Sequence, residues 1–181
     1  MSAQAHTHIP SICDKTNHIQ PHLTPILSTL RPHCLARDRL HLWKPSFSRR
    51  AQDESGRPIR MLSEQDLSRV FEVMAGSWAD STREAYGSGL LVYHVFCDTR
   101  TIPEVQHAPA SSVLIAAFIA SLARSHSGSA ISNYLYGIRA WHTLHGARWH
   151  LNDTEMAAVL KGADKMAPAS SKRKKQRPYT I

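Results

Sequence analysis

Long apolar runs are missing from this sequence of 181 residues. A membrane-spanning helix needs about 20 consecutive apolar residues, and no stretch approaches that length. The N-terminus also lacks the apolar core of a secretory signal. We therefore expect a soluble, intracellular protein that has no membrane partner.

Cysteine is also scarce. Cys13, Cys34 and Cys97 lie far apart, whereas zinc sites and disulfide frameworks use closely spaced sets. The histidines of the first 41 residues are scattered among prolines rather than placed at the spacing of metal ligands on a helix. We therefore expect reduced thiols, no metal ion and no cofactor.

Acidic residues are absent from the last thirteen positions. Residues 169–181 carry five Lys/Arg, residues 1–60 carry nine against four Asp/Glu, and residues 61–168 carry eight against ten. The net charge of +8 therefore resides in the two ends of the chain. A polyanion would be attracted chiefly to these ends, and no feature points to a small-molecule substrate.

Helical periodicity is absent before residue 61. The first 60 residues are rich in Pro, His, Ser and Thr, and such a stretch buries too little apolar surface to offset its ordering entropy. We predict that residues 1–60 form a disordered basic tail. Within this tail, Leu35 to Trp43 is expected to become a short helix only on contact with a partner.

From Met61 onward, apolar residues recur at helical spacing. The pattern predicts no strand and five helices: an accessory helix over 61–76, one from Ser81, one over "SSVLIAAFIASLA", one over "SGSAISNYLYGIRAWHTLHG" and one from Asn152 to Pro168. We therefore expect an all-α fold, a compact bundle of four to five helices. Residues 169–181 would follow it as a basic linker or tail.

Polar residues at the helix starts predict specific caps. Ser63 with Asp66 and Asn152 with Glu155 have the spacing of capping boxes. Ser81 is the predicted N-cap of the second helix.

Two glycines and one apolar segment predict how the helices pack. Gly87 and Gly89 weaken an otherwise good helix, which indicates either close approach of another backbone or sequence drift. The segment "SSVLIAAFIASLA" has apolar residues all round, so we predict that it is the central buried helix.

The fourth helix separates two faces at 100° per residue. Its core face is predicted to comprise Ile131, Tyr134, Leu135, Ile138, Trp141 and His142. Ser132, Tyr136, Arg139 and Thr143 share the other face. This second face is either plain solvated surface or a surface that contacts a partner.

Together, "STREAYGSGLLVYHVFC", "VLIAAFIASLA", "SAISNYLYGIRAWHTLHG" and "ADKMAPASSKRKKQRP" resemble the N-terminal core-binding domain of tyrosine recombinases and phage-type integrases, especially those of eukaryotic mobile elements. The resemblance covers about residues 77–178 and makes 77–168 the core-binding-like domain. It implies a SAM-like bundle that forms half of a clamp around double-stranded DNA. It also implies other recombinase protomers as partners, a catalytic domain outside this sequence and no catalysis by this chain alone.

Three groups of residues are the candidate DNA contacts. A helix N-terminus offers free amides, which favours Thr82 and Arg83. The outward part of the fourth helix contributes Ser132, Asn133, Tyr136 and Arg139. The closing basic run contributes Lys172, Arg173, Lys174, Lys175 and Arg177, cations suited to phosphates.

A short motif also matches the catalytic pattern of these recombinases. His145 and Arg148 form the pattern His-x-x-Arg, and Tyr179 follows at a separation that would suit a nucleophilic tyrosine. Phosphoryl transfer, however, needs preorganised cations around the phosphate, which three scattered residues do not supply. We interpret the match as chance.

A second hypothesis belongs to another class. The run Lys172 to Lys175 fits a nuclear localisation signal as well as it fits a DNA linker. The chain would then be a helical protein-interaction module. Both hypotheses predict a nuclear protein.

Overall fold

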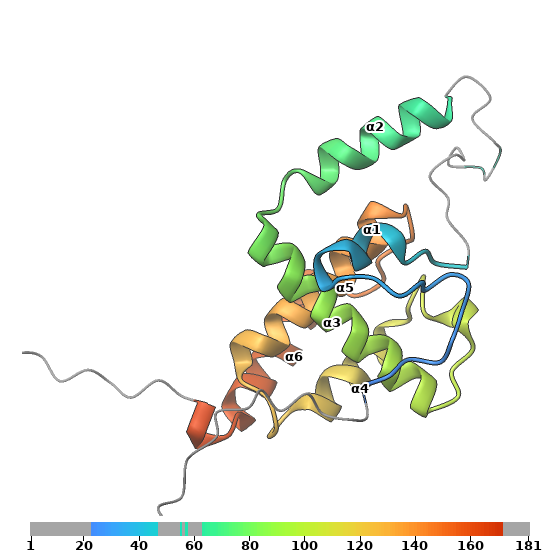
Figure 1. Cartoon of the computed structure of the whole chain (residues 1–181). Coiled ribbons are helices and arrows are strands. Elements are labelled where there is room, and N and C mark those ends of the chain that lie inside the picture. Colours follow the sequence, from blue (N-terminus) through green and yellow to red (C-terminus); the bar gives the residue numbers. More distant parts are fainter. Residues whose placement is uncertain (1–22, 47–54, 56, 58–62, 172–181) are drawn as a thin grey trace, which may run out of the picture.

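The computed structural model describes residues 23–46, 55, 57 and 63–171. The predicted all-α bundle is confirmed for these residues, which form helices and no strand (Figure 1). The α helices are α1 (Arg39–Leu42), α2 (Glu64–Ala75), α3 (Asp80–Thr99), α4 (Ser112–Leu122), α5 (Gly128–Leu144) and α6 (Asp153–Met166). Short 3-10 helices are η1 (Ala36–Asp38), η2 (Glu104–Gln106) and η3 (Ala169–Ser171).

Helices α3 and α5 form the centre of the bundle and run antiparallel. A Cβ atom at Gly89 would lie 2.5 Å from Cα of Tyr134, and one at Gly137 would lie 2.7 Å from the carbonyl oxygen of Tyr86. Only glycine allows two helices to approach this closely. Of the two interpretations left open for the glycines of α3, the structure supports close approach of another backbone.

The outward and inward faces of α5 follow the predicted division, except that Tyr134 of the predicted core face is only half-buried. Ile131, Leu135, Ile138 and Trp141 are fully buried. His142 is buried with them. Tyr136 and Thr143 are exposed on the opposite side.

Two of the three predicted caps are confirmed. Ser63 with Asp66 caps α2, and Asn152 with Glu155 caps α6, each as a complete capping box. The prediction for Ser81 is wrong. The extended backbone that a cap requires occurs at Ala79, so α3 begins at Asp80 without a side-chain cap.

The segment predicted as the central helix, α4, lies at the edge of the bundle instead. One face buries Ile115, Phe118 and Ile119, and Phe118 packs edge-on against Tyr93 of α3. The other face is open, with Val113 76% exposed. Apolar composition on all sides therefore did not identify the buried helix, because small alanine side chains tolerate solvent.

The prediction of disorder is wrong for residues 23–46, which pack along α3 and α5 (Figure 1). Leu40 and Trp43 are only 2% and 3% exposed. The indole Nε1 of Trp43 donates to the carbonyl of Pro32 at 2.9 Å, and Nε1 of Trp141 donates to the carbonyl of Trp43 at 2.7 Å. The short helix expected on contact with a partner thus forms on the chain's own bundle. Except for Ser55 and Arg57, the other residues of the predicted disordered tail lie outside the described ranges.

Candidate nucleic-acid interface

A shallow hollow crosses the outer side of α3 and α5. It is lined by Trp78, Tyr86, Tyr136, Arg139, Ala140 and Thr143. Trp78 precedes α3, Tyr86 lies on α3, and the other four lie on α5. The glycine contacts that bring α3 against α5 also bring these side chains together. We call these six residues the aromatic groove.

Arg139 is the cation of this groove. Its side chain is 41% exposed, and Nη1 contacts Oδ1 of Asp153 at 3.2 Å. The same nitrogen contacts the sulfur of Met156 at 3.6 Å. A surface ion pair of this kind contributes about 0–1 kcal/mol, so α6 orients the guanidinium without withdrawing it from a ligand.

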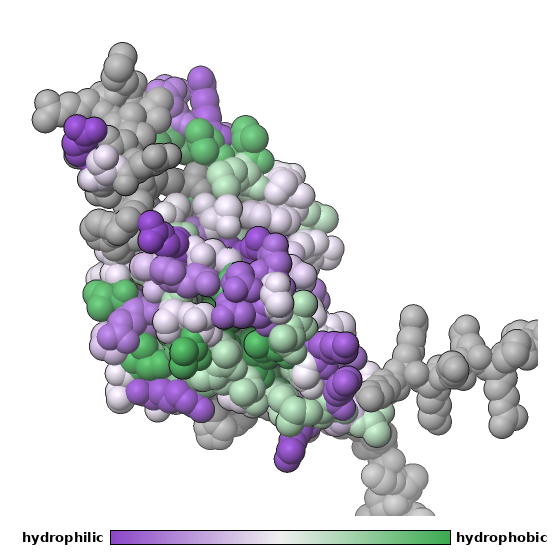
Figure 2. All heavy atoms as spheres, turned by 180° about the vertical axis from the view of Figure 1, so that it is seen from behind, coloured by the Kyte–Doolittle hydropathy of each residue, from purple (hydrophilic) through white to green (hydrophobic). Residues whose placement is uncertain are grey.

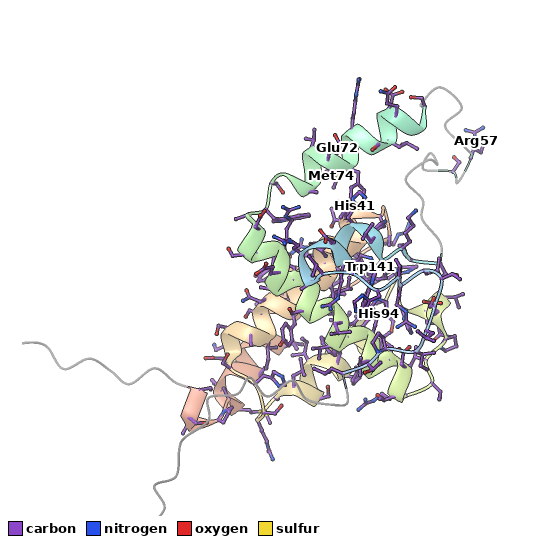
Figure 3. All side chains as sticks on the ribbon, viewed as in Figure 1. His41, Arg57, Glu72, Met74, His94 and Trp141 are labelled. Carbon is purple, nitrogen blue, oxygen red and sulfur yellow. The ribbon has the colours of Figure 1, made fainter. Side chains whose placement is uncertain are left out.

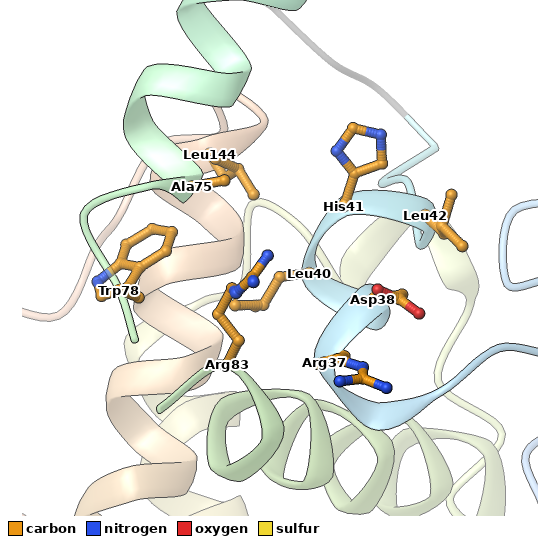
Figure 4. Close-up of a pocket in the computed structure, with 9 residues that line it drawn as sticks. All are labelled: Arg37, Asp38, Leu40, His41, Leu42, Ala75, Trp78, Arg83 and Leu144. Atoms are coloured by element: carbon orange, nitrogen blue, oxygen red, sulfur yellow. The ribbon is translucent and has the colours of Figure 1, made fainter. Parts of the chain in front are cut away.

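Arg83 lies in the first turn of α3 and is the more constrained cation. Its Nη2 pairs with Asp80, and this hydrogen bond, with the charge of Arg83, lowers the pKa of the Asp80 carboxyl. Arg83 also lines a second hollow with Trp78 and Leu40, opposite Arg37 (Figure 4). Thr82, its neighbour, is half-buried. Arg83 and Arg139 therefore flank Trp78 in separate hollows.

The predicted α5 residues do not all meet. Ser132 is half-buried and Asn133 is exposed, and both lie nearer the start of α5 than Tyr136 and Arg139. At 1.5 Å per residue, Ser132 is about 10 Å from Arg139 along the axis. The residues form a strip along α5, and only Tyr136 and Arg139 enter the groove.

The basic run, Lys172 to Arg177, lies outside the described residues. The helix that precedes it, α6, runs antiparallel to α5. Asp153 at its start pairs with Arg139, and Asp164 near its end lies against Gly128 at the start of α5. The last described residue, Ser171, follows shortly after that end.

Trp78 and Tyr86 were missed by sequence reasoning. Trp78 lies between two helices, where no periodicity assigns a face. Tyr86 shares helical spacing with Leu90 and Tyr93, which favours a buried position, yet it is only half-buried. Burial and the neighbouring Tyr136 raise the pKa of Tyr86, so the two phenols lie close enough to interact. A tryptophan directly before an aromatic-rich helix was the only available signal.

Three other arginines make contacts within the protein. Arg31 is 3% exposed at its side chain and binds Asp98 and Glu104, each at 2.9 Å. Arg39 donates to the carbonyl of Gly87 at 3.1 Å. Arg100 covers the ring of Phe96, with 3.8 Å from its guanidinium carbon to the ring centroid.

The residues that match the recombinase motif lie apart from the groove. His145 is buried at the end of α5, and its Nε2 donates to the carbonyl of Leu40 at 2.9 Å. Arg148 is exposed in the following loop. Tyr179 lies outside the described residues.

The interior of the described bundle holds a group of buried histidines. His94 and His107 face each other with 3.0 Å between their Nδ1 atoms, and Nε2 of His107 donates to the carbonyl of Ile102. Figure 3 shows His94 beside Trp141 inside the bundle. Within the described ranges, no three His, Cys, Asp or Glu side chains are grouped so that they could hold a metal ion. Nor does any helix there have the length and apolarity of a membrane span.

Comparison with known proteins gave no match: no family model, curated protein or solved structure matches this chain. The resemblance to recombinase core-binding domains therefore stays a prediction from the quoted segments.

Proposed function

We propose that this chain is a DNA-binding domain of the tyrosine recombinase or integrase type, non-catalytic by itself and nuclear. It binds double-stranded DNA with the outward strip of α5, the start of α3 and the basic run at the C-terminus. Phosphate contacts supply most of the affinity.

The observation that carries the proposal is the position of Arg139 on α5 relative to the end of α6. The chain leaves α6 near Gly128, and Arg139 lies eleven residues further along α5, about 16 Å away at 1.5 Å per residue. That length is roughly half of a helical turn of DNA. We propose that the basic run, which follows Ser171 in the sequence, and Arg139 contact one stretch of phosphate backbone.

The charge of the folded part supports a large contribution of the basic run to DNA affinity. Residues 23–46 carry four Lys/Arg and one Asp, whereas residues 63–171 carry eight Lys/Arg and ten Asp/Glu. The folded part is therefore nearly neutral. One of its arginines, Arg31, is also neutralised inside the protein.

The test is a salt series on the full chain. Alanine at Lys172, Arg173, Lys174 and Lys175 together should flatten the plot of log K against log salt by about 0.9 for each phosphate that the variant no longer neutralises. Fluorescence anisotropy measures this slope on a duplex of about 30 base pairs. Such a duplex is longer than the half helical turn of DNA that the interface would span. An unchanged slope would remove the basic run from the interface.

The protein-interaction alternative is favoured by a different surface. A third hollow, between α4 and α6, is shallow and is lined mainly by Val113, Ala116, Leu151, Ala158 and Val159. Figure 2 shows one face of the molecule, where apolar side chains gather in the lower half. If the four-alanine variant bound duplex normally and a fluorescent fusion lost nuclear accumulation in cells, the basic run would be an import signal and this alternative would replace the proposal.

A further inference from the structure

Tyr136 is the one exposed Phe, Trp or Tyr side chain in the part of the chain that the structure describes, with 43% of its surface open. Its ring lies in the aromatic groove with Trp78 and Tyr86. The rings of Trp78 and Tyr86 contact each other edge-on, with centroids 6.2 Å apart. Tyr136 thus presents a ring beside two others that are already packed, and its own outer side remains open.

A cation stands on the same helix face. Arg139 follows Tyr136 by three residues, so the two side chains are neighbours on α5. The contacts of its Nη1 with Asp153 and Met156 hold the guanidinium at the rim of the groove. A ligand with a flat apolar body and a negative group beside it fits this arrangement.

We propose that the aromatic groove binds an unpaired base of single-stranded DNA, stacked on Tyr136, with the adjacent phosphate on Arg139. The inference rests on the proposed function and names the form of DNA that this part of the surface takes. Bases within a duplex are stacked on their neighbours and offer no open ring face. An unpaired base does, and aromatic stacking of this kind tolerates any base.

A proline-rich peptide is the other ligand that aromatic grooves receive. The charge of this chain favours the nucleic acid. Five Lys/Arg and no Asp/Glu lie within residues 169–181, and such an end attracts a polyanion rather than an uncharged peptide.

The test uses three variants of Tyr136 in the full chain. Tyr136→Phe keeps the ring, Tyr136→Leu keeps an apolar side chain without a ring, and Tyr136→Ala removes both. Because Tyr136 is exposed on α5, we expect all three to fold, which circular dichroism checks. The probes are a single strand of about 12 nucleotides, a length that one such groove and its flanks can span, carrying 2-aminopurine, and the fully paired duplex.

The expected result is a loss of about ten-fold or more in single-strand affinity for Tyr136→Leu and Tyr136→Ala, since neither new side chain can stack on a base. Tyr136→Phe should bind like wild type and should keep the quenching of 2-aminopurine that stacking causes. Affinity for the duplex should fall by a smaller factor than affinity for the single strand, because phosphate contacts supply most of the duplex affinity.

Three results would overturn the inference. Equal single-strand binding and quenching by all variants, with duplex binding intact, would remove the base site and leave the proposed function standing. Binding of neither DNA by wild type would remove both. A proline-rich peptide whose affinity falls in Tyr136→Leu, while single-strand affinity does not, would reassign the groove to peptide binding.

Discussion

The segment of residues 23–46 and the outward strip of α5 both carry arginine, and they use it in opposite ways. Arg31 is 3% exposed at its side chain and binds two carboxylates. Arg139 is 41% exposed and binds one carboxylate at the surface. The first arginine attaches the segment to the bundle, whereas the second remains open to a ligand. Local charge density in the sequence did not distinguish them.

The comparison shows that the role of an arginine can be judged from its carboxylate partner, and in particular from whether that carboxylate is buried or exposed. Without Arg31, Asp98, whose side chain is 9% exposed in the intact protein, would lose its ion-pair partner and keep the N–H of Ile26. Without Arg139, Asp153 would simply face water, because its side chain is 87% exposed. We therefore assign the segment to stability and the strip to binding, and the predictions below test that assignment.

Acid should have the largest effect on stability, and it should act through the buried histidines of the bundle. Burial lowers the pKa of His142 to about 4, and burial followed by the charge of His107 lowers the pKa of His94 well below its usual value. The unfolded chain thus binds more protons than the folded one. The contribution of these histidines to stability is therefore fully present above about pH 6.5 and is lost as the pH drops toward 4. His142 alone should account for about 3 kcal/mol.

Urea denaturation at pH 7, 5.5 and 4.5 measures this decrease in stability. The geometry explains this decrease, because protonating His107 would place an N–H against the donor Nδ1 of His94. A free energy of unfolding that did not change between pH 7 and 4.5 would contradict the buried neutral histidines.

Trp43→Ala should come next, destabilising the protein by about 3–5 kcal/mol, because it empties a buried site against α3 and α5. Leu42→Ala is the matched control, since Leu42 is its exposed neighbour and should cost less than about 0.5 kcal/mol. Thermal or chemical denaturation compares them. Equal costs would mean that the segment is not docked.

Arg31→Ala should cost about 3 kcal/mol because it strands a buried carboxylate. Arg139→Ala should cost less than about 1 kcal/mol. Chemical denaturation of both variants tests the opening comparison directly. The assignment of roles fails if Arg139 proves the more costly of the two.

Periodicity and caps predicted much of the bundle. The capping boxes at Ser63 and Asn152 and the two faces of α5 follow from spacing within a few residues, and the structure has them. The docking of residues 23–46 could not be predicted this way. It depends on single side chains whose partners are distant in sequence: Arg31 with Asp98, and Trp43 with Trp141.

The candidate site was predictable in the same uneven way. Tyr136 and Arg139 share a helix face, so spacing placed them together. Trp78 and Tyr86 joined them only because glycines let α3 and α5 approach closely. No local pattern carries that information.

The most direct test of the central claim, that the strip on α5 faces DNA, uses two variants that each remove one positive charge: Arg139→Gln and Arg100→Gln. Arg100 lies at the opposite end of α3, over the ring of Phe96, and is therefore the control. Anisotropy on duplex DNA across a salt series should give a slope lower by about 0.9 for Arg139→Gln and an unchanged slope for Arg100→Gln. Equal changes in the two variants, or none in Arg139→Gln, would contradict the claim.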